Sequence, residues 1–302
     1  MKRSEIAVEE RSLYNRPSTT LALARSAQEL RYSFNEVYNN ERKDSSMNPT
    51  LETLLNRKSM RAFEKRDIEA DVKTKILEAT LRAPTAGNMM LYSILDITDQ
   101  SLKEKLVKTC DDQPFIARAP MVWIFLADYQ RWYDYFVLSG ADTLSDERMR
   151  KPEEGDLFLA CSDALIAAQN AVIAADSFGL GSCYIGDIME NYEIHKELFN
   201  LPPHVFPIGM LVFGYPTQQQ KDRQMTTRFD EKFIVFENQY QRLKEDDFAE
   251  MFAEREKQLP QGKAMRGITN YGQYFYNRKL ASDFSVEMSS SVRKMVKVWV
   301  DG

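Results

Sequence analysis

Apolar residues recur at helical spacing near the start of the chain. The stripe consists of Leu23, Ala27, Leu30, Phe34 and Val37. Intervals of three and four residues place these side chains on one face of a helix. We therefore expect residues 1–46 to form a helical extension that buries this face on the main body or on a partner, with the polar residues 44–46 as a short linker.

From residue 49 onward the pattern alternates between helical and strand-like segments. Apolar spacing predicts helices over 53–57, 67–81 and 157–178. Short apolar runs predict strands over 92–98, 120–127, 182–185 and 207–213. The run at 120–127 is almost uninterrupted, which is typical of a strand buried on both faces. The tail from residue 240 onward is expected to be largely helical.

The predicted helix over 157–178 contains seven alanines. Small side chains let a neighbouring element approach closely, so this helix is a candidate for the core or for a subunit interface. Its apolar stretch is interrupted by Asp163, Gln169, Asn170 and Asp176. Because of these polar residues we do not expect it to span a membrane.

Composition narrows the class of protein. Of the 302 residues, 43% are hydrophobic, which is enough for a folded core and excludes a disordered chain. The 40 basic and 45 acidic residues give a net charge of −5, which argues against a nucleic-acid-binding protein. The three cysteines are odd in number and widely spaced, and the first residues lack the apolar segment of a secretory signal. We therefore expect a cytoplasmic protein with reduced thiols.

Familiar catalytic and metal-binding patterns are missing from the sequence. The two histidines, His195 and His204, are not paired at metal-binding spacing, and no Cys-x-x-Cys occurs, so no metal site is expected. His195 lies in a helix-like polar stretch and is expected to be solvated. Residues 179–186 lack the third glycine of a dinucleotide-binding loop because Tyr184 occupies its position. No nucleophile elbow or Walker loop is present.

The segment 57–61 carries the first candidate site. In an extended chain Arg57, Ser59 and Arg61 point to the same side, because side chains alternate with a period of two. Such a face would suit a phosphate and a polar ring edge, through charge-assisted hydrogen bonds. The alternative is an ordinary solvated charge cluster.

Two further segments are open to two interpretations each. A predicted strand ends at Gly214-Tyr215-Pro216 and is followed by Lys221, Arg223 and Arg228, which form either a second anion site or an ordinary basic loop. Four aromatic residues cluster at 132–136. They are equally suited to packing in the core or over a cofactor and to stacking on a substrate.

In combination, these segments resemble the FMN-dependent nitroreductase family. The matching pieces, in the order of the family, are residues 57–63, 83–88, 119–120, 163–169, 179–183 and 214–216. The resemblance covers about residues 49–235. It implies an α+β fold, with a central mixed or antiparallel sheet flanked by helices, in an intertwined homodimer that holds FMN at the subunit interface. Residues 47–302 would then form one nitroreductase-like domain, with residues 236–302 as its C-terminal helical extension.

The resemblance also implies roles for individual residues. Arg57 and Ser59 should contact the phosphate or ribityl chain of FMN, and Lys58 fills a position that is often arginine in the family. Arg61 should lie near the pyrimidine edge of the flavin, where its charge would stabilise the anionic reduced form. Arg228 is the best candidate for a second phosphate-binding arginine, and Arg223 is the alternative.

Backbone contacts to the flavin are implied at two places. A loop of the other chain should approach the cofactor through Pro84, Thr85, Ala86, Gly87 and Asn88. The backbone of Ile185 and Gly186 matches the place where amides meet the flavin ring near N5. The chain departs from the family after Asn88, where Met89-Met90-Leu91-Tyr92 replaces the common x-Gln-Pro-Trp, and residues 129–156 have no firm match.

The implied activity is hydride transfer from NAD(P)H through FMN to a nitroaromatic, quinone or flavin acceptor, in a ping-pong cycle. Flavin carries the redox chemistry, so no catalytic side-chain base is needed. Two alternatives stay open. One is a specialised reductase on the same fold, such as a dehalogenase or an enone reductase, with substrate preference set by residues 129–156. The other is a non-catalytic flavin-binding protein.

Overall fold

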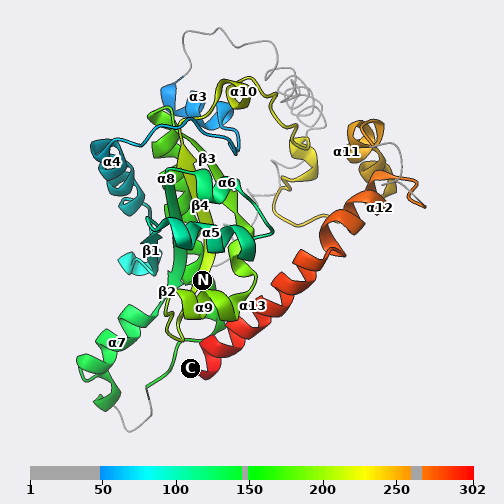
Figure 1. Ribbon diagram of the computed structural model, residues 1–302. Helices are drawn as coiled ribbons and strands as arrows, with labels where there is room; N and C mark the ends of the chain where they lie inside the picture. The colour runs from blue at the N-terminus through cyan, green and yellow to red at the C-terminus, as the bar shows by residue number, and fades with distance from the viewer. Residues whose placement is uncertain (1–47, 145–148, 260–266) are drawn as a thin grey trace, which may run out of the picture. The chain divides into compact units, whose positions relative to one another are not determined.

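A computed structural model describes residues 48–144, 149–259 and 267–302. The helical extension expected over residues 1–46 lies outside the described residues. Those that are described divide into two compact units, one made of residues 48–226 and 267–302 and the other of residues 227–259. The first unit contains the sheet and most of the helices (Figure 1).

The centre of the first unit is a four-stranded antiparallel sheet. Its strands, in spatial order, are β1 (Tyr92–Asp96), β2 (Met121–Asp128), β4 (Val205–Gly214) and β3 (Gly181–Ile185). All four predicted strands are therefore confirmed, with shifted ends. Every residue of β2 is buried, as its unbroken apolar run predicted. A bulge interrupts the pairing of β2 with β4 between Phe125 and Leu126.

One face of the sheet is covered by the long helix α8 (Glu154–Ser177), and α4 (Ala70–Leu81) packs on α8 (Figure 1). Trp123 and Phe125 of β2 point toward this layer, where the alanines of α8 are buried except for Ala174, which is half-buried. Their small side chains let the helix lie close to the sheet. The prediction of a core helix is confirmed, and the helix predicted over 67–81 begins at Ala70.

Side chains from the other face of the sheet meet a second set of helices. Val122 and Ile124 alternate along β2 with Trp123 and Phe125, and they pack with Leu106 and Ile116. These come from α5 (Gln100–Thr109) and α6 (Phe115–Arg118); η3 (Gly186–Met189) and α9 (Tyr192–Leu198) continue the layer. The two-sided packing explains why β2 is apolar at every position.

His195 of α9 is fully buried, and so the expectation that it is solvated was wrong. Its Nδ1 lies 2.9 Å from the Ile188 carbonyl oxygen and its Nε2 lies 2.8 Å from Thr109 Oγ1. These partners satisfy both ring nitrogens inside the core. Burial lowers the pKa of His195, so the ring is held in its neutral form.

The C-terminal helix α13 (Asp283–Asp301) packs on α9 and η3 (Figure 1). Met295 and Trp299 are buried there, and the indole Nε1 of Trp299 donates to the Glu153 carbonyl oxygen at 3.1 Å. The segment before it contains α12 (Tyr271–Phe275) and the π-helix η6 (Tyr276–Leu280). The tail is helical, as predicted.

Shorter elements complete the part of the chain that the structure describes. In the first unit these are α3 (Pro49–Asn56), η1 (Ala86–Asn88), α7 (Gln130–Leu138), η2 (Ala141–Thr143) and α10 (Gln218–Lys221). The second unit contains η4 (Glu231–Phe233) and α11 (Glu245–Lys257). Within it the guanidinium of Arg255 lies 3.9 Å from the centre of the Phe229 ring, a cation–π contact.

Among the described residues, α8 is the one helix whose length and apolar composition would allow it to cross a membrane. One face of α8 is buried against the sheet and α4, which explains why the residues on that face are apolar. The other face exposes Phe158, Leu159, Leu165 and Ile166. A helix that is apolar all round is expected to be covered on both sides.

Candidate functional site

The segment 57–61 runs along the edge strand β3. Ser59 forms a parallel bridge with Ser182, and the amide of Met60 donates to the Ser182 carbonyl oxygen at 2.8 Å. Met60 is buried against Gly181. A Cβ atom at position 181 would stand 2.4 Å from Met60 Cγ, so only glycine lets the segment lie this close to β3.

The residues of this segment differ in burial. Met60 is buried, Arg57, Lys58 and Ser59 are half-buried, and Arg61 is exposed. Both arginines lie close enough to Cys183 of β3 to lower the pKa of its thiol, although burial has the larger effect and raises it. Within the described part of the chain, neither Arg57 nor Arg61 forms an ion pair with a carboxylate. At longer range Arg57 acts on Asp176 of α8, because burial raises the pKa of that carboxyl and Arg57 lowers it. The two guanidinium groups therefore present positive charge that no direct ion pair neutralises.

A second basic loop is tied to this segment. Lys58 Nζ donates to the carbonyl oxygens of Lys221 at 2.5 Å and of Arg223 at 2.7 Å. In return, Arg223 Nη1 donates to the Ser59 carbonyl oxygen at 3.3 Å, and the amide of Arg61 donates to Gln220 Oε1 at 3.0 Å. The structure thus gathers Arg57, Arg61 and Arg223 in one region, with Lys58 bonded to the loop.

Arg228, the other candidate for a second phosphate contact, belongs to the second compact unit. Its Nη1 donates to the Thr227 carbonyl oxygen at 3.4 Å. Arg223 and Arg228 both stay candidates for the second phosphate contact.

At the far end of β3 the backbone becomes accessible. Ile185 is buried, but Gly186 is exposed, and a Cβ atom there would meet only Met189 Cε at 4.0 Å. The next residues form η3. Glu190, which follows η3, is 5% exposed, and its Oε1 has no hydrogen-bond partner. Burial and the neighbouring Asp187 raise the pKa of Glu190 to about 8.

The loop 84–91 lies beside the opposite edge of the sheet, because it leads directly into β1. Gly87, Asn88 and Met90 all have positive φ, at 55°, 59° and 52°. β1 and β3 are separated by two strands, which amounts to roughly 14 Å between the edge strands. One chain therefore places this loop and the segment 57–61 beside different edges.

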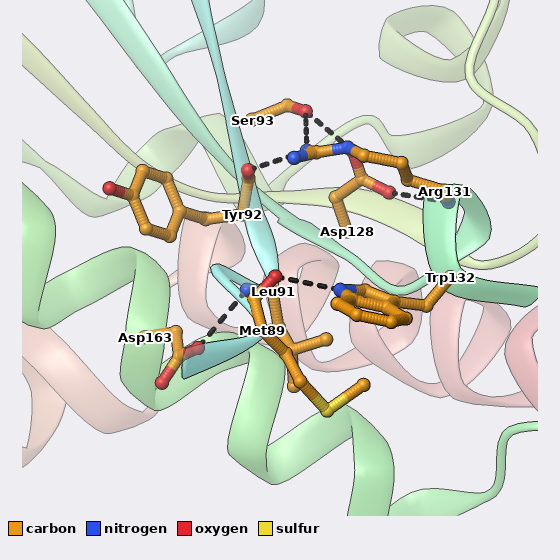
Figure 2. A network of polar contacts seen from close by, with 8 residues as sticks. All are labelled: Met89, Leu91, Tyr92, Ser93, Asp128, Arg131, Trp132 and Asp163. Atoms are coloured by element: carbon orange, nitrogen blue, oxygen red, sulfur yellow. Dashed lines mark hydrogen bonds and ion pairs between the residues drawn. The ribbon is translucent and has the colours of Figure 1, made fainter. Parts of the chain in front are cut away.

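Two side chains from other elements hold this loop (Figure 2). The carboxylate of Asp163, in α8, accepts the Ala86 amide at 2.9 Å and the Leu91 amide at 3.1 Å. The indole Nε1 of Trp132, in α7, donates to the Met89 carbonyl oxygen at 2.7 Å. Sequence reasoning missed both roles. The one signal for Asp163 was a carboxylate in an otherwise apolar stretch of helix.

Next to this loop lies a small polar cluster on β1 and β2. Arg131 Nη2, from α7, donates to the Tyr92 carbonyl oxygen at 2.9 Å and to Asp128 Oδ2 at 3.1 Å. Ser93 Oγ also donates to Asp128 Oδ2, at 2.5 Å. The stretch 129–156, which sequence comparison could not interpret, therefore carries a helix that is bonded to the loop and to β1 (Figure 2).

Comparison with known proteins places these features in a family. The model of the nitroreductase family matches residues 54–215. The oxygen-insensitive NADPH nitroreductase of Salmonella typhimurium is 32% identical over 221 residues, covering 73% of this chain and 85% of that protein. The FMN reductase (NADPH) of Bacillus subtilis is 30% identical over 203 residues, covering 67% and 78%.

A solved structure agrees with these matches. The NADPH:FMN oxidoreductase of Vibrio harveyi, determined in complex with NAD+, is similar with a TM-score of 0.66 and 25% identity. The similarity covers 82% of this chain and 98% of that one. The α+β fold with its antiparallel sheet is the one expected from the sequence resemblance. From the matched residues and the shared fold, the chain belongs to the nitroreductase family.

Proposed function

We propose that this protein is an NAD(P)H-dependent FMN oxidoreductase of the nitroreductase type. The observation that carries the proposal is the pair Arg57 and Arg61, two arginines that form no direct ion pair in the described residues, beside an edge strand that is followed by the exposed backbone of Gly186. Its relatives support it, since they include an NADPH nitroreductase and an FMN reductase.

The residues present fit FMN. Guanidinium groups that form no direct ion pair suit a phosphate, and an exposed glycine backbone lets a flat ring approach closely. We assign the phosphate and ribityl chain to Arg57 and Ser59, with Arg223 or Arg228 as the second arginine. Lys58 acts by fixing the loop 221–223, through its bonds to two carbonyl oxygens there.

The chemistry that bound FMN supplies is the transfer of a hydride, taken from NAD(P)H, to an electron acceptor. This chain contributes position and charge. Arg61 is proposed to place its guanidinium near the pyrimidine edge of the ring, where it stabilises negative charge. The backbone of Ile185 and Gly186 is proposed to orient the opposite side of the ring. We propose nitroaromatics, quinones and free flavin as acceptors, in a ping-pong cycle.

A homodimer is the proposed functional form. The loop 84–91 and the segment 57–61 lie beside opposite edges of one sheet, so both could contact one FMN if they came from two chains. The exposed apolar face of α8 supports this arrangement, because Phe158 is 73% exposed in the single chain. Leu51 and Leu54 of α3 are exposed as well, and α3 packs on α8. Apolar faces of this kind are typical of subunit interfaces.

The cellular setting and the division of the chain are also proposals. All three cysteines are free, which is consistent with a reducing cytoplasm. We propose that residues 47–302 act as one nitroreductase-like domain, with residues 236–302 as a C-terminal helical extension.

The experiment is a spectroscopic one. The purified protein, incubated with FMN and passed through a desalting column, should keep the absorbance of bound flavin. This absorbance should be lost on adding NADPH or NADH without oxygen, and should return on adding a quinone or a nitroaromatic. Retained flavin that neither nucleotide reduces would favour a non-catalytic flavin-binding protein. A colourless protein would contradict the proposal.

A further inference from the structure

The loop 84–91 has an unusual backbone for its sequence. Three of its residues are in the left-handed region, and two of them, Asn88 and Met90, are not glycine. Asparagine tolerates this region, but a side chain such as methionine rarely adopts it. Such a conformation persists only where the surrounding structure holds it. Two side chains from outside the loop, Asp163 and Trp132, make contacts that hold it.

Asp163 supplies two of these contacts. Its side chain is buried, with 2% of the residue exposed, and each of its two oxygens accepts one amide of the loop, from Ala86 and from Leu91. Among the described residues, no basic side chain forms an ion pair with it. A buried carboxylate is costly unless its hydrogen bonds are made. The amides of Ala86 and Leu91 thus stabilise the carboxylate of Asp163, and the carboxylate in turn holds the two parts of the loop to which these amides belong.

Trp132 supplies the third contact from the other side. Its indole Nε1 donates to the carbonyl oxygen of Met89, which lies between the two amides that Asp163 binds (Figure 2). No residue of α7 is fully buried. The indole bond therefore ties α7 to the middle of the loop.

We propose that Asp163 and Trp132 are positioning residues that hold the loop 84–91 in its left-handed shape, ready to contact the cofactor of the partner subunit. This inference rests on the proposed function, because the loop matters only if it meets FMN. Asp163 acts from α8 on the two ends of the loop, and Trp132 acts from α7 on its middle. Neither residue needs to touch FMN.

Two substitutions each remove a hydrogen bond to the loop, and the first of them leaves the side-chain volume almost unchanged. Asp163→Asn places an amide NH2 against one of the two backbone N–H groups, so one bond is lost and the charge is removed. Trp132→Phe keeps an aromatic ring but removes the indole N–H. Glu154→Gln serves as the control, because it makes the same carboxylate-to-amide change at an exposed position of α8.

The first measurement uses hydrogen exchange in the flavin-free protein. In Asp163→Asn the amides of Ala86 and Leu91 should exchange faster, whereas the amide of Ile94 in β1 should keep its protection. Trp132→Phe should speed exchange across the loop. Unchanged exchange in both variants would overturn the inference. This readout does not depend on FMN, so it remains decisive even if the proposed function fails.

The second measurement is FMN binding, followed by flavin fluorescence and by the visible circular dichroism of the bound flavin. Losing a charge-assisted bond that preorganises the loop should weaken binding by about 10- to 100-fold in Asp163→Asn. The dichroism should change in both variants, and Glu154→Gln should match the natural protein. If the natural protein binds FMN and both variants bind it with the same affinity and dichroism, the loop is not positioned in this way. If Asp163→Asn does not fold, the FMN affinity and flavin dichroism of Trp132→Phe test the inference.

Discussion

Met60 lies directly against the backbone of Gly181, and this contact sets the distance between the segment 57–61 and the strand β3. A Cβ atom at position 181 would stand 2.4 Å from Met60 Cγ and 2.7 Å from Met60 Cβ. The bridge between Ser59 and Ser182 depends on this approach. The candidate phosphate site is thus built on Gly181, the first residue of β3.

We predict that Gly181→Ala destabilises the protein by about 1–3 kcal/mol, because the added methyl group must push Met60 out of its position. Urea unfolding of the flavin-free protein measures this difference. Gly155→Ala is the matched control, since no atom lies within 4 Å of a Cβ at that position in α8. That substitution should be neutral or stabilising. Equal stability of the two variants would show that Met60 gives way without cost.

The sequence predicted secondary structure best for the elements whose residues are most completely buried. The strand over 120–127 was predicted from its unbroken apolar run, and β2 is buried at every position. The alanine pattern likewise predicted the core helix α8. The start of α4 could not be located in the same way, because Glu69, its N-cap residue, makes no side-chain capping bond.

The candidate site could be predicted from the sequence only in part. Alternation over 57–61 predicted a common face for Arg57, Ser59 and Arg61. Burial does not follow this alternation, because Lys58 is half-buried like Arg57 and Ser59. The bonds of Lys58 to carbonyl oxygens more than 160 residues away follow from tertiary packing, which leaves no local pattern. Trp132 could not be assigned for the same reason, since its partner is a backbone carbonyl. The burial of His195 was hidden because its two partners are a backbone oxygen and a distant threonine.

The pH dependence of stability should carry the signature of Glu190. Its pKa is raised from 4.5 to about 8, first by burial and then by Asp187, with Asp111 and Glu287 adding to the effect. Between about pH 4.5 and 8, the folded protein therefore holds a proton on Glu190 that the unfolded chain has already released. This group favours folding at the acid end of that window, and its contribution is lost as the pH rises through 8.

We predict that Glu190→Gln, which cannot ionise, is more stable than the natural protein above pH 8 and that the difference shrinks toward pH 5. Thermal unfolding of both proteins at several pH values in this range measures the difference. A stability difference that does not change with pH would mean that Glu190 is not protonated in the folded state.

The apolar face of α8 gives a prediction about assembly. If this face is the subunit interface, Ile166→Asp places a charge there and should convert the dimer to a monomer, because a buried unpaired charge is costly. Ile166 is 41% exposed in the single chain. Leu81→Asp, at a position of α4 with 44% exposure, is the control and should leave the assembly unchanged. Sedimentation velocity distinguishes the two states, and a natural protein that is monomeric would contradict the proposed dimer.

The most direct measurement is a titration of the flavin-free protein with FMN, followed by quenching of flavin fluorescence, for the natural protein, Arg57→Ala and Arg82→Ala. Arg82, exposed after the end of α4, is the matched control. We predict saturable binding to the natural protein and to Arg82→Ala. Loss of one charge-assisted contact should weaken binding to Arg57→Ala by about 1.5–3 kcal/mol. Absence of FMN binding to the natural protein, or equal affinity in all three, would contradict the assignment of the site.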